Sequence, residues 1–274
     1  MFRRTTKVAL AKRGIRATQV KVAVGLLAAA TMAVSVGWLL ATSGGPPRPQ
    51  ARPPRAAPAR PAVRHGPTAT PSALLPATAT VATVVRSTLG YASPGQVGKD
   101  IVPASWYGRP SVLPVIGTQP GWVRVRIAQR PNGSTAWLPD SDVKLGSTPY
   151  RIVVHTATMH LALYKHGKLV FSAPAGVGTA DDPTPLGEYF VAFDEPPPNP
   201  GYGAFIMVTS AHSSAIQDWE GSGDAVIGIH GPLGMDTAIG TTGARVSHGC
   251  IRLHDQALDG LSKVPPGTPI DVVG

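Results

Sequence analysis

The chain has 274 residues, of which 31 are Gly and 29 are Pro, a composition that disfavours long helices and favours strands joined by turns. Its formal net charge is +10, but residues 1–80 hold twelve Lys or Arg and no acidic residue, while residues 81–274 hold thirteen basic and fifteen acidic ones. The charge therefore excludes a basic nucleic-acid-binding face on the folded part, for which we expect a predominantly all-β architecture.

The N-terminus has the charge pattern of a membrane-inserted segment. Residues 1–21 are basic, and residues 22–41 carry no charge. Twenty residues in a helix span about 30 Å, the thickness of the hydrocarbon core of a bilayer. The positive-inside rule then predicts a single-pass transmembrane helix with the basic N-terminus in the cytoplasm and the rest of the chain exported.

A cleavable signal peptide is the alternative to this anchor. The apolar run is longer than a usual signal-peptide core, and no convincing A-x-A cleavage site precedes Thr42, so we favour a retained anchor over a secreted protein. A lipoprotein is excluded because no cysteine lies near the end of the run. A buried soluble helix is disfavoured because the cationic flank lies on one side only.

Residues 42–80 are predicted to be a disordered linker. Ten prolines fall between Gly44 and Pro76. Such a segment cannot build a core and samples polyproline II, which extends by about 3.1 Å per residue. We interpret it as a tether that carries the folded part away from the membrane.

Residues 81–147 are expected to form a small β module. Alternating apolar residues and a Pro131–Gly133 turn predict a β-hairpin. The expected strands are 112–116, 121–127 and 135–138. The pairing of G-W-V-R-V with a later A-W-L-P resembles a small SH3-like β-barrel of the bacterial wall-associated type. Trp122 and Trp137 are interpreted as core residues of this module rather than as a glycan-binding platform.

Residues 148–274 are expected to form a second β domain. It begins with strands around Arg151 and Leu161, joined to a third strand, and contains a polar loop at 211–224 that is a candidate substrate cover. A strand over residues 225–229 delivers His230 to its end. Asp255 is predicted to cap one or two helical turns, and a final strand is expected at 269–273.

Residues with reactive side chains lie close together in the sequence near the C-terminus. The chain reads I-H-G-P at 229–232 and S-H-G-C-I-R-L at 247–253, and Cys250 is the only cysteine. Ser, His and Gly bury little apolar surface, so S-H-G-C is poor core material. A thiol beside imidazoles and glycines has the parts of an activated sulfur nucleophile, and these residues alone leave the base open between His230 and His248.

These residues allow two other interpretations. A lone cysteine is often a small buried hydrophobe. A zinc site is the sharper rival, since His230, His248, Cys250 and His254 are four possible ligands. Neither C-x-x-C nor H-E-x-x-H accompanies them, and a closed structural site would leave no nucleophile, so the nucleophile interpretation is favoured.

The two motifs together resemble the signature of the L,D-transpeptidase family, whose catalytic domain is of the YkuD type. T-P-L-G-E-Y at 184–189 resembles a further family segment, so the similarity covers residues 150–273. The resemblance implies a β-sandwich catalytic domain in which Cys250 is the nucleophile and His230 the base, oriented by the carbonyl of Gly231.

The resemblance also implies roles for the neighbouring residues. His248 and Gly249 would shape the loop and supply backbone N–H groups to an oxyanion site together with Cys250. Ser247 would fix the loop and, with Arg252, belong to the substrate-binding set. Arg252 would hold a carboxylate of a peptide stem.

The implied reaction is a two-step acyl transfer on peptidoglycan peptide stems. Cys250 would form a thioester with the third residue of a tetrapeptide stem and release the terminal D-alanine. An amine of a second stem as acceptor gives a cross-link, water gives an L,D-carboxypeptidase, and a lipoprotein amine gives an anchoring enzyme. No metal or organic cofactor is required, and carbapenem-type β-lactams are expected to acylate Cys250. A non-catalytic wall-binding protein and a zinc hydrolase are the alternatives from other classes.

Overall fold

The computed structural model describes residues 75–219 and 221–274 of the chain. The predicted basic N-terminus (1–21), the predicted transmembrane helix (22–41) and most of the predicted linker (42–80) lie outside the described residues. Within the described part, the helices are all too short to cross a bilayer.

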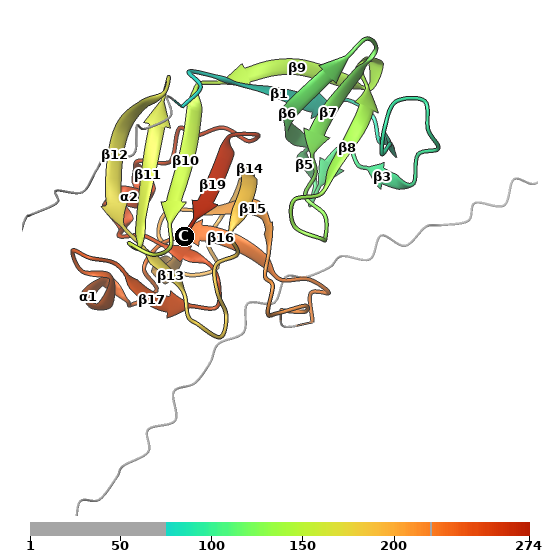
Figure 1. The fold of residues 1–274 in the computed structure, drawn as a ribbon. Helices are drawn as coiled ribbons and strands as arrows, with labels where there is room; N and C mark the ends of the chain where they lie inside the picture. Colours follow the sequence, from blue (N-terminus) through green and yellow to red (C-terminus); the bar gives the residue numbers. More distant parts are fainter. Residues whose placement is uncertain (1–74, 220) are drawn as a thin grey trace, which may run out of the picture. The chain divides into compact units, whose positions relative to one another are not determined.

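The first folded part is an antiparallel sheet of five strands, which we call the N-terminal sheet unit (residues 79–148). Its strands follow the order β8-β7-β6-β1-β9, and every neighbouring pair is antiparallel (Figure 1). The strands are β1 (Ala79–Val84), β6 (Val112–Gln119), β7 (Trp122–Arg126), β8 (Thr135–Pro139) and β9 (Val143–Thr148). A 3₁₀ turn, η1 (Asp140–Asp142), joins the last two strands.

Two short ribbons complete this unit. β2 (Thr88–Gly90) pairs with β3 (Asp100–Val102), and β4 (Ser105–Trp106) pairs with β5 (Arg109–Pro110). The predicted hairpin is present, because β7 pairs with β8 on either side of the Pro131–Gly133 turn. β1 begins at Ala79, inside the predicted linker. The SH3-like character of the unit stays a prediction.

The second part is one mixed sheet of ten strands. Its order is β12-β11-β10-β19-β14-β15-β16-β18-β13-β17. The strands are β10 (Tyr150–His155), β11 (His160–Lys165), β12 (Lys168–Pro174), β13 (Gly176–Gly178), β14 (Gly187–Glu195), β15 (Ile206–His212), β16 (Val226–His230), β17 (Ala244–Ser247), β18 (Ile251–Arg252) and β19 (Pro269–Val273). The described chain is thus mostly β, as its Gly and Pro content predicts.

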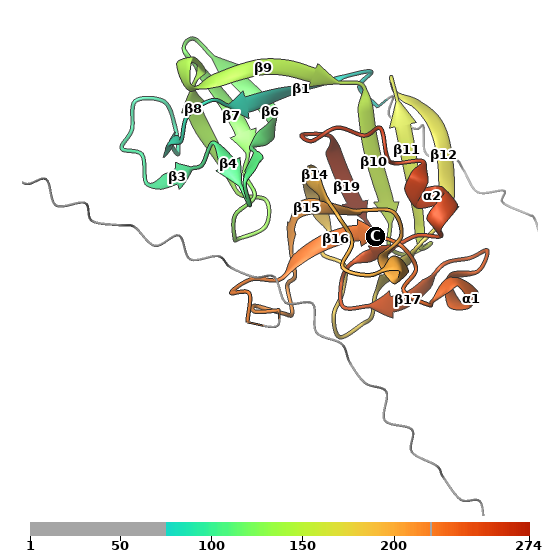
Figure 2. The same ribbon diagram turned by 180° about the vertical axis from the view of Figure 1, so that it is seen from behind.

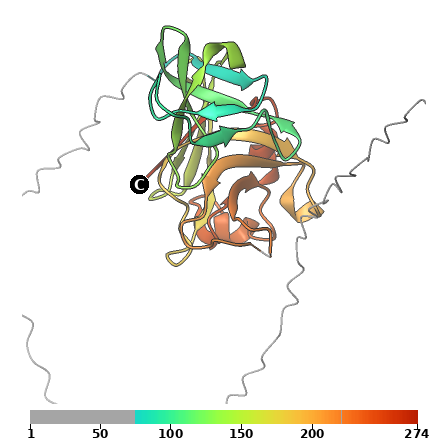
Figure 3. The same cartoon turned by 90° about the vertical axis from the view of Figure 1, so that its right-hand side faces the viewer.

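The ten-stranded sheet curls because β14 pairs with one strand along its first half and with another along its second half. Its first half pairs with β19 and its second half with β15, with a register shift between Val191 and Phe193. This change of partner lets the two halves of the sheet face one another, and Figure 3 shows the yellow, orange and red ribbon of this sheet turned by 90°. The expected sandwich is realised as a single curled sheet.

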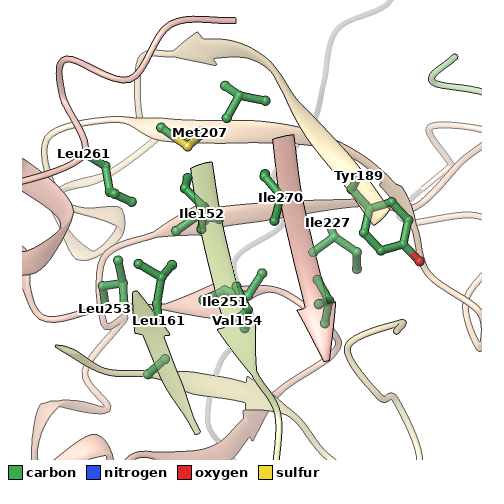
Figure 4. Close-up of a cluster of buried hydrophobic side chains, with 14 of the residues drawn as sticks. Ile152, Val154, Leu161, Tyr189, Met207, Ile227, Ile251, Leu253, Leu261 and Ile270 are labelled. Atoms are coloured by element: carbon green, nitrogen blue, oxygen red, sulfur yellow. The ribbon is translucent and has the colours of Figure 1, made fainter. Parts of the chain in front are cut away.

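One core fills the inside of the curl. Ile152 of β10, Leu161 of β11, Met207 of β15 and Ile251 of β18 are fully buried members of the same hydrophobic cluster (Figure 4). Strands from both halves of the sheet contribute to it. Apolar burial of this kind is the main stabilising term, since the single cysteine permits no internal disulfide.

Helices are short and lie outside the sheet. They are α1 (Asp236–Ile239) and α2 (Asp255–Asp259), with a 3₁₀ turn η2 (Pro200–Tyr202) before β15. The turned view shows α2 next to β11 and β12 (Figure 2), and its Leu258 is fully buried in the core. The predicted cap was wrong, because His254 precedes the helix and Asp255 is its first residue, without a capping hydrogen bond.

Candidate active site

Strand pairing brings the two C-terminal motifs side by side. β16 and β18 are parallel neighbours, with Ile229 opposite Ile251 and His230 opposite Arg252. Residues some twenty positions apart in the sequence therefore meet at the ends of adjacent strands, a common place for functional side chains. Side chains of both motifs line a pocket of about 270 Å³.

The pocket contains four of the residues singled out from the sequence. They are His230, His248, Cys250 and Arg252. Gly231 and Gly249 do not line the pocket, and their backbone groups bond to His230 and Ser247. Ser247 is 2% exposed and does not line the pocket, and its substrate-binding role stays a prediction.

A network of hydrogen bonds shapes the loop that carries Cys250. The Ser247 hydroxyl donates to the carbonyl of Cys250 (2.5 Å) and accepts the N–H of Gly249 (3.2 Å). Gly249 has a φ of +113°, and a Cβ there would lie 2.8 Å from Cδ1 of Ile227. Only glycine takes this backbone conformation readily. Because the N–H of Gly249 is bonded within the loop, its predicted oxyanion role requires release from Ser247.

The sulfur of Cys250 accepts a hydrogen bond from the backbone N–H of Gly228, with an N···S distance of 3.4 Å. Burial raises the pKa of the Cys250 thiol, and the Gly228 N–H and the nearby Arg252 guanidinium act in the opposite direction. In the described residues no hydrogen bond joins the sulfur to an imidazole. The resting group is therefore a neutral thiol, which would have to lose its proton to act as a nucleophile.

His230 is held as a neutral imidazole of defined tautomer. Burial, against the opposing effect of the hydrogen bond to Gly231 and aided by the Arg252 guanidinium, lowers the pKa of His230 to about 4. Its Nδ1 lies 2.8 Å from the carbonyl oxygen of Gly231, the contact expected from the resemblance. A carbonyl only accepts, so Nδ1 carries the proton and Nε2 keeps a lone pair. Of the two candidate bases, this one has a fixed acceptor nitrogen inside the pocket.

Backbone and ring contacts hold this imidazole in place. The N–H of Gly231 donates to the carbonyl of Tyr202 (2.6 Å), and the Tyr202 ring lies 4.7 Å from the imidazole, centroid to centroid. η2 therefore stabilises the C-terminal end of β16. The geometry needs no acidic third member to orient His230.

His248 lies at the rim of the pocket rather than in its depth. Its side chain is 61% exposed, and Nε2 is 3.7 Å from Oδ2 of Asp182. Its ring lies 5.4 Å from that of Trp219, which belongs to the polar loop predicted to cover a substrate. This exposure favours a role at the pocket entrance over one as the base.

Arg252 brings a positive charge to the pocket wall beside Cys250. Its Nε is buried and has no hydrogen-bond partner in the part of the chain that the structure describes. A buried guanidinium nitrogen without a partner is costly, and a ligand carboxylate is its natural acceptor. The placement agrees with the predicted carboxylate-binding role.

The zinc interpretation finds no geometric support. Among residues 75–219 and 221–274, His, Cys, Asp and Glu side chains form no group of three or more that could hold a metal ion. His254, one of the four possible ligands, instead places Nδ1 3.1 Å from Asp236 Oδ1 and Nε2 3.2 Å from the carbonyl of Gly240.

The sequence assigned no individual role to three residues that build the site, although two of them lie in segments that it singled out. Gly228 supplies the N–H to the sulfur, a backbone function with no side-chain signal. Thr184 donates to the carbonyl of Gly249 (2.8 Å) and accepts the N–H of Gly178 (2.9 Å), so the T-P-L-G-E-Y segment supports the Cys250 loop. Trp219 lines the pocket.

Comparison with known proteins connects this site to one family. Residues 149–272 match the model of the YkuD L,D-transpeptidase catalytic domain. Two curated proteins called putative L,D-transpeptidase YkuD are similar over 125 residues, at 32% identity in Bacillus licheniformis and 27% in Bacillus subtilis. Each alignment covers 45% of this chain, which spans 66% of the length of each relative.

Solved structures give further likenesses. An L,D-transpeptidase from Mycobacterium smegmatis is 18% identical with a TM-score of 0.37, over 59% of this chain and 82% of the other. The catalytic domain of the E. faecium L,D-transpeptidase is 26% identical with a TM-score of 0.32, over 45% and 95%. LD transpeptidase LdtMt1 in complex with imipenem is 20% identical with a TM-score of 0.39, over 72% and 82%.

Proposed function

We propose that this chain, whose residues 149–272 form an L,D-transpeptidase catalytic domain, cross-links peptidoglycan peptide stems through a thioester on Cys250. One observation carries the proposal. A thiol, an imidazole with a fixed lone pair and a guanidinium with a buried unpaired nitrogen line the same pocket. These are the nucleophile, the base and the carboxylate anchor that acyl transfer between stems requires.

The first step forms the thioester. Sγ of Cys250 attacks the carbonyl carbon of the L-centred third residue of a tetrapeptide stem, and its proton passes to Nε2 of His230. The C–N bond to the terminal D-alanine then breaks, and the departing amine takes the proton from His230. Arg252 holds the carboxylate of the leaving D-alanine, which positions the bond that breaks.

The second step restores the thiol. An amine of a neighbouring stem attacks the thioester carbonyl, and its proton passes through His230 to the departing sulfur. With water as the acceptor the same acyl-enzyme gives L,D-carboxypeptidase activity, so the acceptor decides between the two products.

Two properties of the pocket support general-base catalysis by His230. Its pKa of about 4 keeps the imidazole neutral at physiological pH. Burial raises the pKa of the Cys250 thiol and so disfavours a free thiolate, which supports a step in which His230 removes the proton as the sulfur attacks.

The test is mass spectrometry of the full chain with a defined stem tetrapeptide. We expect release of D-alanine, a thioester adduct on Cys250 and, with an amine acceptor, a cross-linked product. Cys250→Ala is expected to form no adduct. Cys250→Ala that releases D-alanine at the parent rate would refute the proposal, and a water-derived product alone would assign the carboxypeptidase reaction.

A β-lactam probe tests the same sulfur by another route. The LdtMt1 structure contains imipenem, and we propose that a carbapenem acylates Cys250 of this chain. The intact-mass increase of one carbapenem is expected in the parent and absent in Cys250→Ala.

A further inference from the structure

The loop between β15 and β16 forms one side of the pocket. We call its described residues, 213–219 and 221–225, the covering loop. Its pocket-lining residues are Ser213, Ile216, Trp219, Gly221, Ser222, Asp224 and Ala225. Its ends are closed by a hydrogen bond from the N–H of Ser213 to the carbonyl of Ala225 (2.7 Å). The shape of the pocket therefore depends on how this loop is held.

A single arginine of the N-terminal sheet unit bonds to the covering loop at three points. Arg130 follows β7, and its Nε lies 2.9 Å from Oδ1 of Asp224. Nη1 donates to the carbonyl of Ser213 (2.8 Å), and Nη2 donates to the carbonyl of Ile216 (3.1 Å). One planar guanidinium thus joins both ends and the first turn of the loop, a geometry that lysine cannot reproduce.

Asn132 adds a second anchor where β15 enters the loop. Its Nδ2 donates to the carbonyl of His212 (2.7 Å), and its Oδ1 accepts the N–H of His212 (2.9 Å). The amide side chain therefore pairs with the backbone as a neighbouring strand would. His212 is 2% exposed, and its Nδ1 lies 2.8 Å from Oδ2 of Asp224, so the same aspartate links both anchors.

The covering loop reaches the site through Trp219. Its backbone N–H donates to the carbonyl of Asp224 (2.9 Å), the residue that Arg130 holds. The Trp219 ring then lies 5.4 Å from the His248 ring at the pocket rim. The hydrogen bonds from Arg130 therefore help to fix the position of the Trp219 ring at the pocket rim.

The turn between β4 and β5 brings another residue of the same unit to the pocket. Tyr107 lines it, and the neighbouring Trp106 packs edge to face on Phe193 of β14 at 5.7 Å. The pocket is thus built from two parts of the chain, although every residue named by the motifs lies in one of them.

We propose that Arg130 and Asn132 are positioning residues that hold the covering loop in its substrate-binding conformation, which makes the N-terminal sheet unit part of the stem-binding site. The proposal rests on the proposed function, because the bound molecule is the peptide stem. It assigns to this unit a role in substrate affinity. Neither residue contacts the reacting atoms.

The experiment compares full-length Arg130→Ala, Arg130→Lys and Asn132→Ala with the matched control Arg124→Ala. Arg124 lies in the same sheet and is exposed, and within the described residues its side chain hydrogen-bonds only to the hydroxyl of Thr135. Loss of uniform binding raises KM while kcat is kept, so we expect about a tenfold rise in KM for Arg130→Ala with kcat within about threefold. The KM of Arg130→Lys should lie between those of Arg130→Ala and the parent, and Asn132→Ala should raise KM severalfold.

Hydrogen exchange of the covering loop supplies a readout that needs no substrate. The amides of Ser213 and Trp219 should exchange faster in Arg130→Ala and in Asn132→Ala than in Arg124→Ala. If exchange and KM of both variants match the control, the inference is wrong even though the parent forms its thioester. If the parent forms no thioester, the proposed function fails, and exchange alone decides whether the two residues hold the loop.

Discussion

At the scale of single residues, burial keeps the titratable groups of the site neutral, so Cys250 and His230 do not rest as a thiolate–imidazolium ion pair. The pKa of the Cys250 thiol is raised and that of His230 is lowered to about 4, so both groups rest in their neutral forms. In the proposed reaction, the charge that develops during attack would be stabilised by the Arg252 guanidinium and by the N–H of Gly228. The carbonyl of Gly231 does the orienting that an acidic residue does in other catalytic triads.

The lowered pKa of His230 predicts an acid-sensitive contribution to stability. An unfolded histidine has a pKa of about 6.5, so between about pH 6.5 and pH 4 the unfolded chain binds more protons than the native one. The His230 contribution is fully present above this window and is lost as the pH falls through it. The pKa difference corresponds to a loss of about 3 kcal/mol when complete.

His230→Gln removes this titration, so the free energy of unfolding of the variant should fall less between pH 7 and pH 4 than that of the parent. Urea unfolding at pH 7, 5.5 and 4 measures the difference. Asp194, whose pKa burial raises to about 6, acts in the opposite sense, but it is present in both proteins and cancels in the comparison. Parallel pH profiles for the two proteins would show that His230 is not buried as a neutral base.

At the scale of elements, the loop between β17 and β18 depends on a threonine in the connection between β13 and β14. Thr184 is 5% exposed and bonds to two backbone groups, the carbonyl of Gly249 and the N–H of Gly178. Thr184→Val keeps the shape and leaves both groups without a partner. We expect a loss of about 2–4 kcal/mol in the free energy of unfolding, because each unsatisfied buried group costs about 1–3 kcal/mol.

Urea unfolding of Thr184→Val measures this loss, and turnover of the stem should fall because the Cys250 loop loses its support. Thr118→Val on the exposed end of β6 is the matched control and should change stability by less than about 0.5 kcal/mol. Equal stability of the two variants would mean that the Thr184 bonds do not hold the loop.

The strands and the motif residues were the parts of this fold that the sequence predicts best. Alternation of apolar residues located β7, β8 and β16, and β19 spans residues 269–273 as expected. The motifs predicted that Cys250 and His230 belong to one site, and both side chains line the same pocket. Local pattern carries this information, because a strand and a short motif each depend on neighbours in sequence.

Other features depend on distant parts of the chain and left no local signal. The curl of the sheet comes from β14 changing partners in its middle, and the bond from Gly228 to the sulfur comes from the pairing of β16 with β18. Arg130 lies in no recognisable motif, yet its side chain bonds to residues more than eighty positions away in the sequence. Such contacts become visible only when the strand order is known.

At the scale of the whole described part, the two sheets share buried side chains. Phe190 of β14 is 2% exposed and belongs to the hydrophobic cluster of the N-terminal sheet unit, together with Leu138 and Val125. The Thr148 and Thr268 hydroxyls add a buried hydrogen bond of 3.1 Å between the two parts. A shared core couples the unfolding of both parts.

This coupling predicts one unfolding transition for residues 75–274 and a strong effect of Phe190→Ala. Removing a buried Phe side chain costs about 3–5 kcal/mol, and here the loss falls on the contact between the sheets. Phe190→Ala should therefore lower the midpoint of the common transition or split it into two. Tryptophan fluorescence and far-UV circular dichroism, followed in the same urea titration, distinguish these results.

Val97→Ala serves as the control for this variant, because Val97 is 86% exposed and its truncation should leave the midpoint unchanged. If the parent already unfolds in two separate steps and Phe190→Ala alters only the first of them, the sheets are independent. In that case the covering loop would lose its fixed support whenever the N-terminal sheet unit opens, and the KM of the parent should rise under the mild urea concentrations that unfold this unit alone. A single transition that moves as a whole in Phe190→Ala instead means that the stem-binding pocket is stabilised by the core of both sheets together.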